Sequence, residues 1–287
     1  MINKLAVAAL LLLPCGTQQA AAAAQYCTGY ASTLSFGSYN PATPVSVTTT
    51  VTVNCSNGLA YHVGLNVGYG SGATTTTRIM NSGPYLMSYE MFRDSAHTLN
   101  WGNNPPTDTV NGTGTGSPQA LTVYGLLPAG QYVNPATYTD TITVTITSSL
   151  SPTTFQFGVN ATALSTCAVS TTPLNFGTYS GALTHATSTV TATCSNSTTY
   201  NIGLNAGLGG TTVTSRKMTS PASAKLNYAI FRNSTWTQNW GITIGTDTVG
   251  GTGNGTAQAV TAYGQMAAGQ SGNPATYSDT ITATITY

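Results

Sequence analysis

Asp108 and Asp247 could supply paired carboxylates, because each stands between two threonines in its own half of the chain. Two carboxylates that share one proton perform the acid–base hydrolysis of aspartic proteases. Those enzymes need a glycine after each Asp-Thr pair, and this chain has Val110 and Val249 there instead. We therefore expect both aspartates to stabilise turns by hydrogen bonding to the backbone.

The remaining residues offer little for catalysis or for holding a metal or cofactor. None of the three histidines aligns with a histidine in the other half of the chain. The glycine-rich runs at 112–116 and 251–255 are followed by neither a lysine nor a predicted helix, which a phosphate-binding loop requires. The sequence therefore predicts a protein that is not an enzyme and uses no metal and no cofactor.

Charge is scarce, and this limits the classes of partner. Only 5% of the 287 residues are charged, and seven basic against six acidic side chains give a net charge of +1. A nucleic-acid-binding protein needs a concentrated basic face to neutralise phosphates. We therefore expect no nucleic-acid partner.

Residues 1–24 have the pattern of a secretory signal peptide. Lys4 precedes the short apolar run Leu5–Leu13, and an alanine tract allows cleavage after Ala24. The apolar run is shorter than the roughly 20 residues that cross a bilayer. A lipid attached to Cys15 is an alternative that the preceding proline disfavours. We expect an exported mature protein.

Four cysteines follow the predicted signal peptide, and they are expected to form disulfides. Cys27 and Cys55 lie 28 residues apart, and Cys167 and Cys194 lie 27 residues apart. The four cysteines show no Cys-x-x-Cys spacing and have no histidine nearby, so their pattern does not indicate a metal site. In an exported chain, an even number of cysteines favours the pairs Cys27–Cys55 and Cys167–Cys194. Each closed loop would contribute roughly 3–4 kcal/mol to stability.

The mature chain is one unit written twice. Residues 121–147 and 260–286 are identical at 18 of 27 positions, and further matches extend over both halves. This repeat predicts an N-terminal domain at 25–147, a linker segment at 148–166 and a C-terminal domain at 167–287. Short runs that alternate Thr with Val or Ile, separated by Gly, Asn, Pro and Ser, indicate strands and turns. We predict two all-β domains in tandem, each an immunoglobulin-like β-sandwich.

The two units differ at their ends, and this difference carries the functional prediction. The first unit is followed by an amphipathic segment at 155–164, whose apolar side is Phe155, Phe157, Val159, Ala161 and Ala163. The second unit has the same closing strand, with Ile281, Ala283, Ile285 and Tyr287 on its apolar side, and the sequence ends there. A sandwich without its last strand exposes an apolar groove and an unpaired edge.

We therefore expect 155–164 to act as a donor strand that completes the first domain. The second domain would lack its final strand and would accept one from another protein, as in donor-strand complementation of pilins. The alternative is that 155–164 is an ordinary strand of the second domain.

Two motifs that occur once in each unit resemble the spore coat protein U domain. A cysteine is followed by Leu-x-Phe-Gly-x-Tyr, and Asn-Pro-Ala-Thr-Tyr precedes the closing strand. The matching residues are Leu34, Phe36, Gly37, Tyr39 and 134–138, and then Leu174, Phe176, Gly177, Tyr179 and 273–277. The resemblance covers nearly all of the mature chain and implies a pilin-like fold for both domains.

This family includes the pilins of archaic, Csu-type chaperone–usher pili, and a two-domain member without an N-terminal extension is similar to their tip adhesin. The resemblance therefore implies attachment to hydrophobic or abiotic surfaces, biofilm formation and a location at the fimbrium tip. It implies a periplasmic chaperone, an outer-membrane usher and an adjacent pilin subunit as partners. A coat or cell-surface structural protein of the same family remains an alternative, and so does a secreted carbohydrate-binding sandwich.

Apolar loop residues that the second unit lacks are candidates for the binding surface. An adhesive domain should carry apolar side chains on loops where a connecting domain does not. The candidates are Tyr69, which faces Leu208, Tyr85 and Leu86, which face Ala224 and Lys225, and Tyr132 and Val133, which face Ser271 and Gly272.

Overall fold

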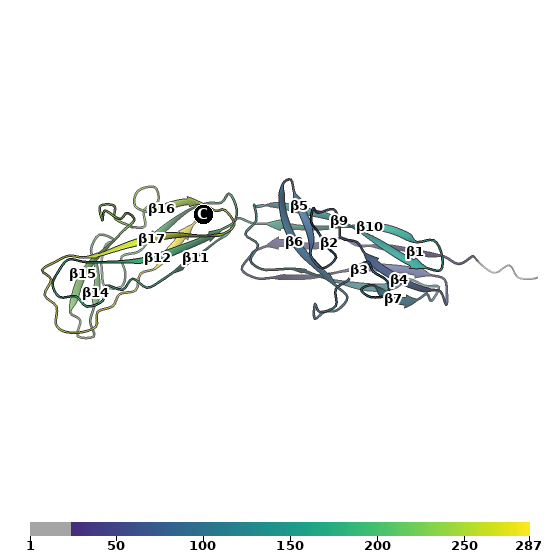
Figure 1. Ribbon diagram of the computed structural model, residues 1–287, viewed down its shortest axis with the longest axis horizontal. Coiled ribbons are helices and arrows are strands. Elements are labelled where there is room, and N and C mark those ends of the chain that lie inside the picture. Colours follow the sequence, from purple (N-terminus) through teal and green to yellow (C-terminus); the bar gives the residue numbers. More distant parts are fainter. Residues whose placement is uncertain (1–23) are drawn as a thin grey trace, which may run out of the picture.

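The computed structural model describes residues 24–287, so the lipid alternative at Cys15 and all of the predicted signal peptide except Ala24 lie outside the described residues (Figure 1). In residues 24–287 all the assigned elements of regular secondary structure are β-strands. The first domain contains β1 Cys27–Ala31, β2 Leu34–Tyr39, β3 Val45–Cys55, β4 Ala60–Leu65, β5 Arg78–Ser82, β6 Tyr85–Phe92, β7 Val110–Thr113, β8 Gln119–Leu127, β9 Ala136–Ser148 and β10 Thr153–Ala163. The second contains β11 Cys167–Thr171, β12 Thr184–Cys194, β13 Thr199–Leu204, β14 Arg216–Thr219, β15 Lys225–Phe231, β16 Val249–Thr252, β17 Ala257–Met266 and β18 Ala283–Thr286. From residue 24 onward, no helix is long and apolar enough to cross a membrane.

Alternating side chains explain why these segments form strands with one buried face. In β9, Tyr138, Ile142 and Val144 are buried, while the threonines between them are more exposed. Threonine and the β-branched aliphatic residues fit a pleated surface that is buried on one side. The period of two therefore both builds the strand and directs its apolar side into the sandwich.

The first domain is a complete sandwich. Strands β1, β3, β8 and β6 form one layer, and β4, β7, β9, β10 and β2 form the other, with the β5–β6 hairpin connecting the layers. β10 pairs antiparallel with β9 along its whole length and parallel with β2 on its other edge. β10 starts two residues earlier than the expected segment 155–164, and it ends one residue earlier than that segment does.

The second domain repeats this arrangement with one gap. Its sheets run in the order β11-β12-β17-β15-β14 and β16-β13-β18. Among the described residues, no strand occupies the place that β10 has in the first domain. The prediction of two β-sandwich domains in tandem, the second without its final strand, is confirmed.

Both predicted disulfides are confirmed. Cys27 is bonded to Cys55, and Cys167 is bonded to Cys194. In each domain the two cysteines are directly opposite each other on the first pair of antiparallel strands. The bond therefore fastens the first strand of each domain to its sheet.

A buried arginine organises the loops in each domain. Arg78 is fully buried, and its guanidinium donates to four backbone carbonyl oxygens at distances between 2.7 and 3.0 Å, those of Leu65, Asn66, Thr75 and Trp101. Burial lowers the pKa of Arg78 from its usual value to about 10. Arg216 makes the same four contacts in the second domain. A planar group with five donors can satisfy several loop carbonyls at once.

We expect Arg78→Met to lower the free energy of unfolding of the first domain by more than about 3 kcal/mol, because four buried carbonyls lose their donor. Urea denaturation of the full chain measures this loss. Arg93→Met is the control, since Arg93 makes one short contact, to the carbonyl of Thr109, and should cost about 1 kcal/mol. Equal losses for the two variants would contradict the role given to Arg78.

The two domains lie end to end and are joined by a short connection (Figure 1). The backbone N–H of Asn196 donates to the carbonyl of Tyr132 at 3.1 Å, and that of Ser195 donates to Thr166 at 2.9 Å. The hydroxyl of Ser195 also donates to the carbonyl of Leu164. The loop that contains Tyr132 therefore contacts the second domain.

Candidate functional site, an open groove in the second domain

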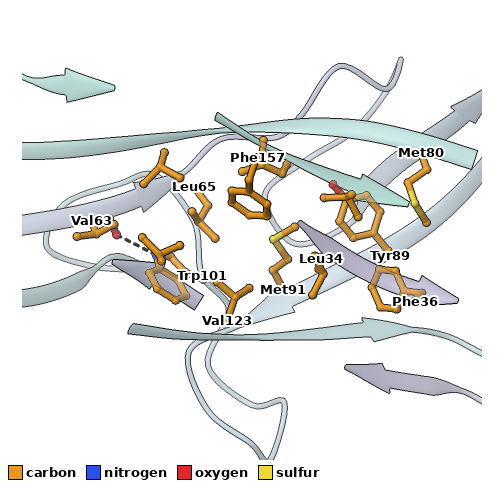
Figure 2. Packing of buried hydrophobic residues seen from close by; sticks show 14 of the residues in the cluster. Leu34, Phe36, Val63, Leu65, Met80, Tyr89, Met91, Trp101, Val123 and Phe157 are labelled. Atoms are coloured by element: carbon orange, nitrogen blue, oxygen red, sulfur yellow. Dashed lines mark hydrogen bonds between the residues drawn. The ribbon is translucent and has the colours of Figure 1, made fainter. Parts of the chain in front are cut away.

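The first domain shows how this sandwich is filled when its last strand is present. On β10, Phe157, Val159, Ala161 and Ala163 are buried, and Phe155 is half-buried against the same core. The ring of Phe157 projects into the middle of the cluster of buried side chains (Figure 2). β10 thus supplies core side chains as well as backbone partners for two strands.

The equivalent region of the second domain is open and has less regular structure. Segment 174–179, which corresponds to β2, forms no assigned strand. The closing strand shrinks from 13 residues in β9 to four in β18. β2 and β9 both pair with β10 in the first domain. The loss of this shared partner accounts for both changes.

The prediction of a continuous closing strand in the second domain is therefore corrected. Ala283 and Ile285 lie in β18, whereas Ile281 precedes the strand and Tyr287 follows it. β18 is paired with β13 along one edge. Its other edge borders the open groove, where no described residue supplies the second ladder of hydrogen bonds that β9 has.

The groove is open and is lined by both apolar and polar residues. One hollow of about 420 Å³ is lined by residues that include Leu174, Phe176, Met218, Tyr228, Ile281 and Ala283. A neighbouring hollow of about 1060 Å³ shares Leu174, Phe176, Met218 and Tyr277 with it and extends to the 270–276 loop. Together they extend over the face that β10 covers in the first domain.

Core side chains are exposed along this groove. Leu34, Tyr138 and Ile142 are fully buried in the first domain, whereas their equivalents Leu174, Tyr277 and Ile281 are only half-buried. Covering a large apolar side chain contributes about 1.5–3 kcal/mol. An occupant that covers this groove would therefore gain substantial binding free energy.

A preformed polar corner lies beside the groove. The hydroxyl of Tyr228 donates to Asp279 Oδ2 at 2.7 Å, and burial together with this carboxylate raises the pKa of Tyr228. Asp279 Oδ1 also accepts the backbone N–H groups of Leu208 and Thr280, each at 2.8 Å. Tyr89 and Asp140 form the same pair in the first domain. This corner is thus present with and without the last strand.

This geometry suits the binding of an extended peptide. A strand placed in the gap would pair with the closing segment on one side and with segment 174–179 on the other. Its alternate side chains would enter the apolar hollow while the others face solvent.

The acids considered for paired catalysis lie in separate domains. Asp108 accepts the backbone N–H of Asn104, and Asp247 accepts that of Thr243, each at 2.6 Å. Each aspartate therefore stabilises its own loop, and the structure does not bring the two together.

Tyr132 and Val133 do not lie on a free loop, in contrast to the expectation for a binding surface. Tyr132 contacts Asn196 of the second domain through its backbone, and Val133 packs against the core of the first domain. Both positions belong to the junction, because the loop after β8 reaches the end of the first domain that faces the second. We therefore remove this pair from the candidate surface.

The other three candidates are exposed, but they come from separate places. Tyr69 is 67% exposed and lies beside β10, where its hydroxyl accepts the Gln156 amide at 3.1 Å. Tyr85 and Leu86 lie at the start of β6, next to the β5–β6 turn, and are 37% and 46% exposed. These three side chains are therefore accessible, but they do not form one surface together with Tyr132.

Sequence reasoning missed exposed aromatic residues at the free end of the first domain. Tyr26 directly precedes β1 and Tyr30 lies within it, and both side chains are exposed. β1 lies toward the end of the first domain that is away from the second domain (Figure 1). The counterparts of the two tyrosines in the second unit are Thr166 and Ser170. The same comparison of the two units that selected Tyr69 would have found them.

The fold and the groove define a class of two-domain β-sandwich protein in which one domain contains its last strand and the other has a groove for one. The chain belongs to the Spore Coat Protein U domain family, whose model matches residues 15–145 and 153–284. The second match begins at the first residue of β10, so in this chain the second matched segment includes the strand that folds into the first domain.

Two known proteins are similar to this chain, one in sequence and one in fold. Protein U of Myxococcus xanthus is 34% identical over 129 residues, which cover 40% of this chain and 71% of that protein. The complex of CsuC with the tip adhesion subunit CsuE, from the archaic chaperone–usher Csu pili of Acinetobacter baumannii, has a TM-score of 0.54. At 18% identity, with 91% of this chain and 100% of that chain covered, this likeness concerns the fold.

Proposed function

We propose that this chain is the tip subunit of a chaperone–usher pilus. Its second domain accepts a donor strand from the adjacent pilin subunit, and its first domain attaches the fibre to a surface. The protein is secreted through the periplasm, where a chaperone protects the groove until an outer-membrane usher exchanges chaperone for pilin.

One observation carries this proposal. Two domains of the same sequence family differ most at one place, which β10 fills in the first domain and which is an open groove in the second. An exposed groove and edge of this kind invite aggregation unless a partner covers them. The likeness in fold to a complex that contains a pilus tip subunit also supports the proposed role as a tip subunit.

For the attachment surface we propose the exposed apolar side chains of the first domain. They are Tyr26, Tyr30, Tyr69, Tyr85 and Leu86. Aromatic side chains on a surface with few charges can bury apolar area on a hydrophobic or abiotic material. Such attachment would support biofilm formation.

A second candidate is a coat or cell-surface structural protein. The relationship to Protein U of Myxococcus xanthus, within a family named for a spore coat, favours this alternative. The same groove would then join subunits of a coat instead of subunits of a fibre.

Immunogold electron microscopy of the native cells, with antibody against residues 25–147, distinguishes the two. We expect one gold particle at the distal end of each thin fibre. Label spread along fibres would indicate a shaft subunit, and label over the whole cell surface would indicate a coat protein. Cells that lack the gene provide the control.

A further inference from the structure

The first domain fastens its last strand from the outside as well as from the core. Gln156 faces outward on β10, opposite Thr143 of β9. Its amide nitrogen donates to the Tyr69 hydroxyl and to Thr143 Oγ1, both at 3.1 Å. Tyr69 therefore lies across the solvent side of β10, and a polar side chain on the strand matches a polar group on the loop.

Leu208 occupies the same place in the second domain. The backbone N–H of Tyr69 donates to Asp140 at 2.8 Å, and that of Leu208 donates to the equivalent Asp279 at 2.8 Å. The two loops are thus held in the same way beside the closing segment. Leu208 is 83% exposed, the highest value among the large exposed apolar residues of the described chain.

From this equivalence we infer that Leu208 selects the strand that enters the second domain, by favouring an apolar outward-facing residue where β10 has Gln156. This inference rests on the proposed acceptor groove and adds the chemistry of its partner. A leucine gives no hydrogen bond to an amide, so glutamine at this position loses the contact it has in the first domain. An aliphatic residue there would instead cover Leu208 and remove its apolar surface from water.

Two synthetic peptides test the inference against the full mature chain, residues 25–287. One has the sequence of β10, residues 153–163, and the other carries the change Gln156→Leu. Fluorescence anisotropy of labelled peptide gives the two dissociation constants. We expect the leucine peptide to bind about fivefold more tightly, as one favourable side-chain pair predicts.

Variants of the chain identify the side chain responsible. Leu208→Tyr should reverse the preference in favour of the glutamine peptide, because it restores the hydroxyl that Tyr69 provides. Ile244→Ser is the matched control. Ile244 is also exposed, but it lies in the loop between β15 and β16, whereas Leu208 is held to the closing segment by Asp279. This control should leave both dissociation constants unchanged.

Equal binding of the two peptides to the unmodified chain, or an unchanged preference in Leu208→Tyr, would overturn the role of Leu208 and leave the acceptor groove intact. Failure of both peptides to bind would instead contradict the acceptor groove, and the inference with it. Thermal unfolding of chains with either strand sequence appended after Tyr287 gives a second measurement in which slow peptide entry plays no part. There too, the leucine version should be the more stable one.

Discussion

A chain with a copy of residues 149–163 appended directly after Tyr287 should have a second domain that unfolds roughly 20 °C higher. Tyr287 aligns with Ser148, the last residue of β9, so the appended copy repeats the turn and strand of the first domain. It should cover Leu174, Phe176 and Ile281, which now line the groove. Covering several half-buried side chains contributes about 5 kcal/mol, and about 1 kcal/mol shifts the midpoint of a small domain by roughly 4–8 °C.

Differential scanning calorimetry measures this change. The matched control is the same extended chain with aspartate in place of the appended copy of Val159, since a charged side chain cannot enter the apolar groove without a large desolvation cost. The first domain serves as an internal reference because its sequence is unchanged. An extended chain that melts like the original would mean that the groove does not accept a strand of this type.

Phe157→Ala should lower the free energy of unfolding of the first domain by about 3–5 kcal/mol, the usual cost of removing a buried aromatic ring. Phe157 is 4% exposed and projects into the core of the first domain (Figure 2). The second domain should keep its stability, although Phe157 lies in the sequence between the two repeats. Denaturant unfolding, followed separately for each domain by hydrogen exchange, measures both effects.

Gln156→Ala is the control for this substitution. Gln156 faces outward beside Phe157, so its loss should cost no more than about 1 kcal/mol. If Phe157→Ala destabilised the second domain instead, β10 would belong to that domain, and the donor-strand interpretation would have to be abandoned.

The repeat, the strand pattern and the disulfides could be predicted from the sequence because they depend on local or matched features. Alternation of threonine with valine or isoleucine is visible in any short window, and it indicates a strand that is buried on one face. Cysteine spacing recurs in both units, and in both the structure joins Cys27 with Cys55 and Cys167 with Cys194. Family motifs are equally local.

The binding loops were the least predictable part, because a loop's exposure depends on what lies next to it. Tyr132 has the same Gly-Gln and Asn-Pro flanks as its counterpart Ser271, yet it lies where the second domain begins. Only the way the chain joins its domains determines that position. Tyr26 and Tyr30 are exposed for the converse reason, since β1 lies toward the end of the first domain that is away from the second domain (Figure 1).

The sequence by itself determined that two similar β-sandwich domains exist and that an amphipathic segment follows the first. The tertiary structure decided how much of each closing segment becomes a strand, even though 18 of 27 positions there are identical. β9 has 13 residues in regular structure and β18 has four. A strand is stabilised by the neighbours it pairs with, so the same residues are ordered beside β10 and irregular beside an open groove.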